Sequence, residues 1–309
     1  MSESQQEAIR ILTAERDELK EHCLRLRAEL DSVGFPPGHF YSPLVDTRDP
    51  EVIHAVSERV SAPPPAGVKL DREAMRATLR RLAAHHGLFP FNREYDGKYR
   101  FYFDNPFFGC HDASVYFSML LEFRPKRVIE IGSGFSSRLL LDTNGHFFDN
   151  GMSTTLVDPS LASLTDLAPP ADTKLFSTRL QDLPLALFDQ LEADDILFVD
   201  SSHVCKTASD VNFYMFNILP RLKAGVLIHI HDILWPFEYP AQWVIDEKRG
   251  WNETYLVRAF LQYNSAFEIL YWNNFVFHHL KDELRVSMPL CLENEGGSLW
   301  IRKTANPPG

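Results

Sequence analysis

The chain has 309 residues, 45% of them hydrophobic, which suffices for one sizeable core with additions or for two small domains. Its formal net charge of −11 argues against non-specific binding to nucleic acid or to an anionic membrane surface, and leaves a small-molecule partner open. No apolar run reaches the roughly 18 residues of a membrane span. The four cysteines are scattered and the N-terminus is polar, so we expect a reduced, cytoplasmic protein.

The N-terminal residues 3–31 have the pattern of one polar helix. Apolar residues recur in it at alternating spacings of three and four, as in a coiled-coil seam that Arg16 interrupts. These residues are Ile9, Leu12, Leu19, Cys23, Leu26 and Leu30. The pattern favours a homo-oligomer that forms through this helix, and the alternative is an amphipathic helix lying on its own domain. Gly34 and the prolines after it end the helix, which gives a first domain of residues 1–34.

Residues 35–110 are expected to form an irregular and helical strap or lid region. A proline-rich linker at 61–66 precedes a predicted helix over 71–86, which has Met75, Leu79 and Leu82 on one face. Residues 92–110 are dense in aromatic side chains, which pack a core or form the lid of a binding cleft.

The third predicted domain, residues 111–309, alternates strands with helices. After a helix over 113–123, the pattern predicts the strands 127–131, 153–157, 174–180, 195–199, 225–231, 267–277 and 297–303. The clearest helix between them is 208–222, and the last two strands are close enough in sequence to form an antiparallel pair. Such alternation is typical of an α/β protein with a doubly wound, mostly parallel sheet.

The segment RVIEIGSGFSS, residues 127–137, predicts a buried strand, a glycine turn and the start of a helix. Gly132 and Gly134 allow a sharp turn and the close approach of a nucleotide or nucleoside. Asp158 follows Gly134 by 24 residues and ends the next strand, where an acid accepts hydrogen bonds from ribose hydroxyls. Ser137 replaces the third glycine of the dinucleotide fingerprint, which weakens the assignment to a dinucleotide.

Polar side chains stand at the ends of four predicted strands. They are Glu130 with the glycine turn, Asp158, Asp200 with Ser201, Ser202 and His203, and His231 with Asp232. A single aspartate at such a place often caps a helix. Four in succession favour one shared site, because parallel sheets bind ligands beyond the carboxyl ends of their strands.

With these motifs in place, EIGSG, VDSSH, HIHD and GGSLWIRK, the chain resembles class I S-adenosylmethionine-dependent methyltransferases over residues 35–303, and within them an uncharacterised bacterial subfamily. The resemblance implies a Rossmann-like sheet of seven strands with the last one antiparallel. It also implies that Glu130, Gly132, Ser133 and Gly134 face the methionine part of S-adenosylmethionine, that Asp158 holds the ribose, and that Gln181 and Asp182 lie by the adenine.

VDSSH and HIHD are similar to the motifs of catechol-type O-methyltransferases, which hold a divalent metal at the same two strand ends, with Asp at the first and Asp-Asn at the second. The resemblance implies a metal held by Asp200, His231 and Asp232, where His231 departs from the family pattern. Carboxylates alone suit magnesium, and the added imidazole shifts the preference toward manganese, iron or zinc. His203 is a candidate general base or fourth ligand. A base mechanism without metal and a site that acts by proximity alone are the alternatives. His229, within its strand, is predicted to be a hydrogen-bonded core histidine.

The expected function is therefore methyl transfer to a small-molecule or sugar-like acceptor, most simply at oxygen. Aromatic residues are candidates for the acceptor pocket, although core packing explains several of them equally well: Phe107, Phe108, Trp235, Phe237, Tyr239 and Trp243. The rival hypotheses are a nicotinamide-dependent oxidoreductase, a non-catalytic partner protein that keeps the fold, and a metal site that performs hydroxylation.

Overall fold

The computed structural model describes residues 2–32, 34–160, 162 and 165–306. Internal contacts divide the chain into two compact units, residues 1–57 with 241–250, and residues 58–240 with 251–309. The smaller unit joins the N-terminal helix to a loop far away in sequence, a grouping that composition did not predict. The domain boundaries expected at residues 34 and 110 stay predictions.

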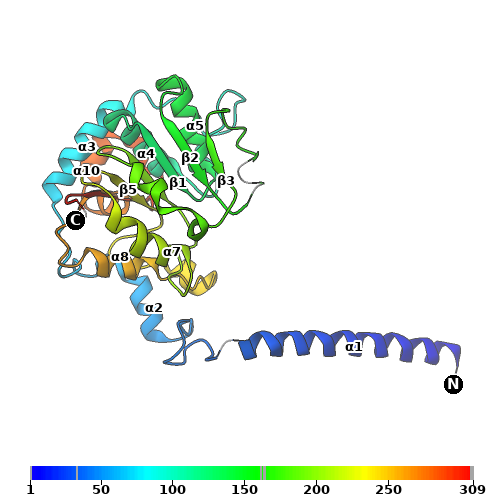
Figure 1. The fold of residues 1–309 in the computed structure, drawn as a ribbon. Helices are drawn as coiled ribbons and strands as arrows, with labels where there is room; N and C mark the ends of the chain where they lie inside the picture. The colour runs from blue at the N-terminus through cyan, green and yellow to red at the C-terminus, as the bar shows by residue number, and fades with distance from the viewer. Residues whose placement is uncertain (1, 33, 161, 163–164, 307–309) are drawn as a thin grey trace. The chain divides into compact units, whose positions relative to one another are not determined.

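The smaller unit contains α1 (Glu3–Ser32), α2 (Pro50–Ser57) and a short π-helical turn at Gln242–Asp246. The helix predicted over 3–31 is confirmed, and α1 is continuous over 30 residues (Figure 1). Leu12 and Leu19 of the predicted seam are exposed, and the side chain of Leu30 lies outside the described part. None of the described helices is both long and apolar enough to cross a membrane.

The larger unit is built on one seven-stranded sheet (Figure 1). Its strands are β1 (Arg127–Ile131), β2 (Ser153–Val157), β3 (Lys174–Phe176), β4 (Ile196–Val199), β5 (Leu227–Ile230), β6 (Phe267–Trp272) and β7 (Leu299–Lys303). They lie in the order β3-β2-β1-β4-β5-β7-β6, and β7 runs antiparallel to both of its neighbours. The Rossmann-like α/β fold with an antiparallel last strand is confirmed.

Successive side chains of a strand point to opposite faces of the sheet, so alternate residues of each central strand belong to two different hydrophobic clusters. On one side Val128 and Phe198 pack with α4 (Cys110–Phe123) and α5 (Phe135–Phe147). On the other side Ile129 and Val199 pack with residues 211–222 and α8 (Glu253–Leu261). Because both faces are covered, the strands are almost continuously apolar.

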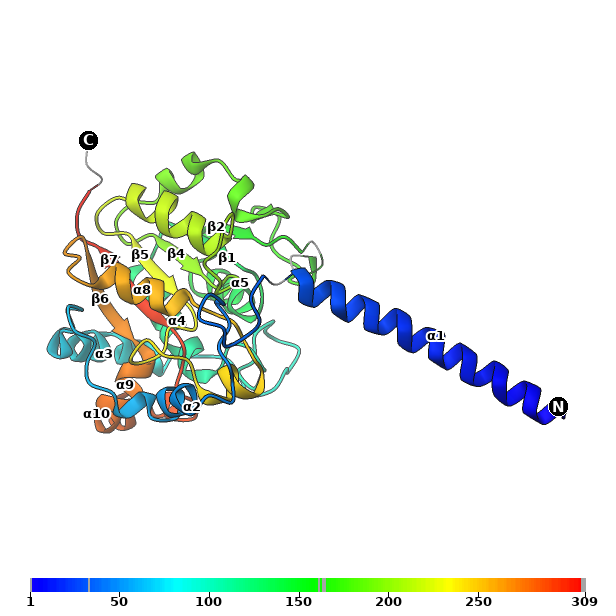
Figure 2. The same cartoon turned by 90° about the horizontal axis from the view of Figure 1, so that it is seen from below.

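Three further helices cover the β6 end of the sheet. They are α3 (Arg72–His86), α9 (Asn273–His279) and α10 (Lys281–Ser287), which Figure 2 shows gathered beside β6. The helix predicted over 71–86 is confirmed, with Asp71 as its N-cap, and Met75, Leu79 and Leu82 are buried.

Three predicted elements are wrong in extent. The strand over 174–180 ends at Phe176, and a 3₁₀ turn follows at Leu180–Asp182. The helix over 208–222 is divided into α7 (Asp210–Phe213), a π turn and a 3₁₀ turn at Leu219–Arg221, where Pro220 lacks the N–H of a regular helix. The strand over 267–277 stops at Trp272, because the buried side chains of Asn273 and Asn274 bond to other elements and α9 begins there.

The register of the sheet places the strand ends side by side. Ile131, at the end of β1, pairs with Val157 of β2 and with Val199 of β4, and Val199 pairs in turn with Ile230 of β5. The residue after each of these four is Gly132, Asp158, Asp200 and His231, respectively. These residues, far apart in sequence, therefore meet at one edge of the sheet.

Candidate functional site

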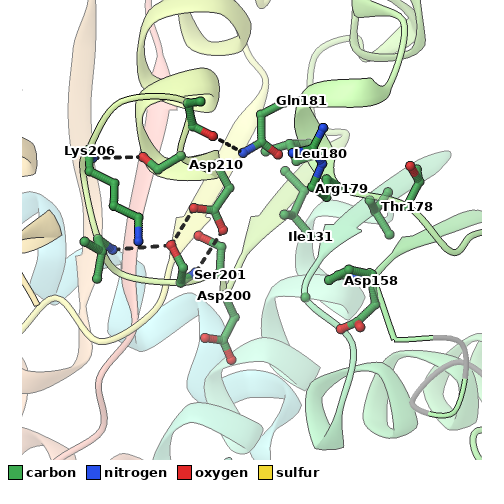
Figure 3. A pocket seen from close by; sticks show the side chains of 17 residues that line it. Ile131, Asp158, Thr178, Arg179, Leu180, Gln181, Asp200, Ser201, Lys206 and Asp210 are labelled. Atoms are coloured by element: carbon green, nitrogen blue, oxygen red, sulfur yellow. Dashed lines mark hydrogen bonds between the residues drawn. The ribbon is translucent and has the colours of Figure 1, made fainter. Parts of the chain in front are cut away.

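Two cavities adjoin at this edge. The first, of about 510 Å³, extends from Gly132 and Asp158 to Gln181, and the second, of about 430 Å³, contains the glycine turn and Phe107. Both are lined by Gly132, Asp158 and Asp200. Figure 3 shows Asp158 and Asp200 on opposite sides of the first cavity, with Gln181 at its far end. Their sizes are those of small-molecule sites.

The two glycines of the turn have different functions. Gly132 has φ +83°, and a Cβ atom there would lie 1.7 Å from the backbone oxygen of Asp200. Only glycine lets the end of β1 pass so close to the end of β4. At Gly134 a Cβ atom would meet nothing within 4 Å, and this residue lines the second cavity. Its bare backbone therefore leaves room for a ligand.

Asp158 ties the glycine turn to the end of β2. Its Oδ2 accepts the backbone N–H of Ser133 at 2.9 Å, and its Oδ1 accepts that of Ser160 at 2.7 Å. Each carboxylate oxygen has a second lone pair, and the side chain lines both cavities. Asp158 is thus fixed in position and still able to accept hydrogen bonds from a ligand.

Glu130 lies beneath the turn and is not among the residues that line the two cavities. Its Oε1 accepts the hydroxyls of Ser136 at 2.7 Å and Ser137 at 2.6 Å, at the start of α5. Complete burial raises the pKa of Glu130 to about 8, although the two serine hydrogen bonds lower it. In the structure this residue secures the start of α5, and the methionine-facing role expected for it stays a prediction.

The raised pKa makes stability depend on pH. The folded chain keeps the Glu130 proton up to about pH 8, whereas the unfolded chain loses it near 4.5, so this group destabilises the fold as the pH rises between the two values. Glutamine cannot ionise. We therefore expect the free energy of unfolding of Glu130→Gln, relative to that of the parent chain, to increase by about 2 kcal/mol as the pH rises from 6 to 8. Urea unfolding of both chains at the two pH values measures this gain, and an unchanged difference would contradict it.

Gln181 and Asp182, expected by the adenine, are separated by the structure. Gln181 lines the far end of the first cavity, and its Nε2 donates to the carbonyl of Ala208 at 2.7 Å. Asp182 is half exposed, pairs with Arg179 at 2.9 Å and is not among the lining residues.

The acidic and imidazole side chains beyond β4 and β5 converge on His203. Its Nε2 lies 3.3 Å from Asp200 Oδ1 and 3.6 Å from Asp232 Oδ2, and His231 Nε2 lies 3.6 Å from Asp232 Oδ1. His203 and Asp232 have φ values of +58° and +56°, a left-handed conformation that is costly for residues with side chains. This backbone strain lies where the segments that follow β4 and β5 meet.

Sequence reasoning missed the residues behind His203. The Nδ1–H of His203 donates to Glu253 Oε2 at 2.8 Å, and the hydroxyl of Tyr214 donates to Glu253 Oε1 at 2.6 Å. Glu253 is buried at the start of α8, and the Trp251 ring packs against the His203 ring with centroids 4.2 Å apart and the planes tilted by 41°. Glu253 is 50 residues from His203, and no local pattern marks it, because its neighbours Asn252 and Thr254 are polar too.

Burial and charge compete in this cluster. Burial lowers the pKa of His203, but the hydrogen bonds to Asp200 and Glu253 outweigh it and raise the pKa well above its usual value. Burial by itself would raise the pKa of Asp200, yet the charges of His231 and His203 lower it to about 2. For Asp232 the burial dominates and the pKa is raised.

Within the ranges that the structure describes, no group of three or more His, Cys, Asp or Glu side chains is arranged to hold a metal ion. The side chains of Asp200, His203, His231 and Asp232 face one another as ion pairs. The metal expected at Asp200, His231 and Asp232 stays a prediction.

The remaining candidates divide between core and cavity. His229 is a buried core histidine as predicted, with Nε2 2.9 Å from Ser298 Oγ and its ring stacked on Phe198. Trp235, Phe237 and Tyr239 are buried and absent from the lining of both cavities, whereas Phe107 and Phe108 line the second. Trp243 belongs to the smaller unit.

The strand order and the glycine turn define the class as a Rossmann-like α/β protein. Residues 129–233 match the family model described as a methyltransferase domain. The chain belongs to the same family as an uncharacterized protein of Archaeoglobus fulgidus. The two are 30% identical over an alignment of 171 positions that covers 52% of this chain and 76% of that protein.

Two solved structures are more distant. One is the plantazolicin methyltransferase BpumL in complex with a desmethylPZN analog and SAH, at 12% identity over 62% of this chain and 82% of that one, with a TM-score of 0.38. The other is a putative methyltransferase from Thermobifida fusca, at 15% identity over 63% and 82%, with a TM-score of 0.37. At such scores the fold assignment rests on the strand order of the sheet.

Proposed function

We propose that this protein is an S-adenosylmethionine-dependent methyltransferase that acts on a small-molecule acceptor, most simply at a hydroxyl oxygen. The observation that carries the proposal is the meeting of Gly132, Asp158 and Asp200 at one edge of the sheet, where each lines two adjoining cavities. A cofactor and an acceptor need such adjoining spaces, because methyl transfer requires them in line.

The first cavity suits the nucleoside. Asp158 has free lone pairs for the ribose hydroxyls, and Gln181 lies where the adenine would end. The open side of Gly134 leaves the space that the methionine part needs beside the turn. When bound, S-adenosylmethionine supplies the sulfonium methyl group, and this chain supplies the orientation of both reactants.

The acceptor would enter beside the cluster of Asp200, His203 and Asp232. A hydroxyl placed there forms hydrogen bonds with groups that now pair with one another at 3.3–3.6 Å. As the oxygen gains the methyl group, its proton passes to a carboxylate of this cluster, because the raised pKa of His203 keeps its ring already protonated. Glu253 holds that ring in place. Phe107, which is exposed and lines the second cavity, offers an apolar surface to a planar acceptor.

Isothermal titration calorimetry tests the cofactor. We expect S-adenosylmethionine and its product S-adenosylhomocysteine to bind with micromolar dissociation constants, and reduced nicotinamide dinucleotide not to bind. Binding of the dinucleotide alone would favour the oxidoreductase hypothesis, and no binding of either at millimolar ligand would defeat the proposal. Methyl transfer from labelled cofactor to a panel of hydroxyl compounds tests the reaction, and failure with all of them would favour the non-catalytic alternative.

Asp158→Asn is expected to weaken S-adenosylmethionine binding by about 10- to 100-fold, because hydrogen bonds to a charged acceptor contribute about 1.5–3 kcal/mol. The matched control is Asp189→Asn, which removes a carboxylate that pairs with Arg221 away from both cavities and should leave affinity within about twofold. Equal losses in the two variants would show that Asp158 does not contact the cofactor.

A further inference from the structure

The longest helix of the chain has an apolar seam that is exposed along its length. In α1, Leu12 and Leu19 are 63% and 64% exposed, and Ile9 and Leu26 are 51% and 45% exposed. Their spacing of three and four residues places them on one stripe of a 3.5-residue period, which is the seam of a two-stranded coiled coil. A stripe of this kind calls for a second helix of matching pattern.

We propose that α1 pairs with α1 of a second copy of this chain, parallel and in register. With Ile9 and Cys23 at heptad position a and Leu12, Leu19 and Leu26 at d, Glu15 falls at g and Lys20 at the following e. In a parallel pair the g position faces the partner's next e position, so that Glu15 meets the partner's Lys20, twice by symmetry. An antiparallel pair sets g beside g and loses both attractions.

Arg16 at position a limits the strength of the pair and favours two strands. A charged residue at one a position lowers stability and specifies the oligomer state and register. Its guanidinium lies 2.7 Å from Asp17, which draws the charge out of the seam. With only about three heptads, we expect dissociation in the micromolar range.

Sedimentation of the full chain measures the pairing. We expect a species of twice 35.5 kDa at tens of micromolar. Leu19→Asp at a d position should raise the dissociation constant about 100-fold or more, since two buried leucines are lost. The matched control is Leu24→Asp on the same helix, where leucine is 66% exposed but lies at position b outside the seam, and it should leave the dimer intact.

Cys23 reports the orientation. It lies at an a position, where a parallel pair sets it against the partner's Cys23, and it is exposed, while Cys110 and Cys291 are buried. Mild oxidation with copper phenanthroline should therefore link two chains, and Cys23→Ser should prevent the link. A monomer at all concentrations, a dimer that Leu19→Asp leaves intact, or a dimer without a Cys23 link would each overturn the proposal.

Discussion

Gly132→Ala is expected to cost the fold more than about 3 kcal/mol and to abolish cofactor binding. The added methyl group would lie 1.7 Å from the carbonyl oxygen of Asp200, and alanine would also have to adopt a φ of +83°. The methyl group and the carbonyl oxygen cannot both keep these positions, so the end of β4 must move away from the end of β1. That movement separates Asp200 from Asp158, which together line both cavities.

Gly134→Ala is the matched control for this substitution. Its methyl group meets nothing within 4 Å and its φ of −172° suits any residue, so we expect stability within about 1 kcal/mol of the parent chain. The methyl group does occupy the second cavity, and S-adenosylmethionine should bind at least about tenfold more weakly. Urea unfolding and calorimetry measure the two effects. Equal stability of both variants would mean that β1 and β4 do not approach as closely as described.

His203→Gln is expected to lower the rate of methyl transfer by about 10²-fold, because the charged ring orients Asp200 and Asp232, the carboxylates that take up the acceptor's proton. The affinity for S-adenosylmethionine should stay within about threefold, since His203 is absent from the lining of the first cavity. Single-turnover rates with the best acceptor of the hydroxyl panel, together with calorimetry, separate the two quantities. His54→Gln, at an exposed position of α2, is the control.

Glu253→Gln tests how His203 is held. The amide keeps the shape of the side chain and one acceptor oxygen, but it removes the charge that fixes Nδ1–H of the ring. We expect a smaller loss of rate than for His203→Gln, and a double variant no slower than His203→Gln by itself, because both act through one ring. Additive losses would show that Glu253 acts independently of His203.

The strands of the sheet and the edge at which the site forms follow from local sequence patterns. Apolar runs that end in Asp158, Asp200 and Asp232 can be recognised in the sequence as strands. The carboxyl ends of parallel strands lie at one edge of a sheet, so these acids are predicted to lie together. The positions of β1, β2 and β7 and the helix at Arg72–His86 follow from local periodicity and capping. These features depend on neighbours in sequence, which is the information that a sequence displays.

Which side chains touch depends on contacts between segments that are far apart in the chain. Glu253 reaches His203 across 50 residues, and buried Asp112 accepts hydrogen bonds from the backbone N–H groups of Gly297 and Ser298, at the approach to β7. Neither acid stands at a strand end, so no local pattern marks it. The turn at Asn273 likewise results from distant hydrogen bonds of Asn273 and Asn274, which override the local strand preference.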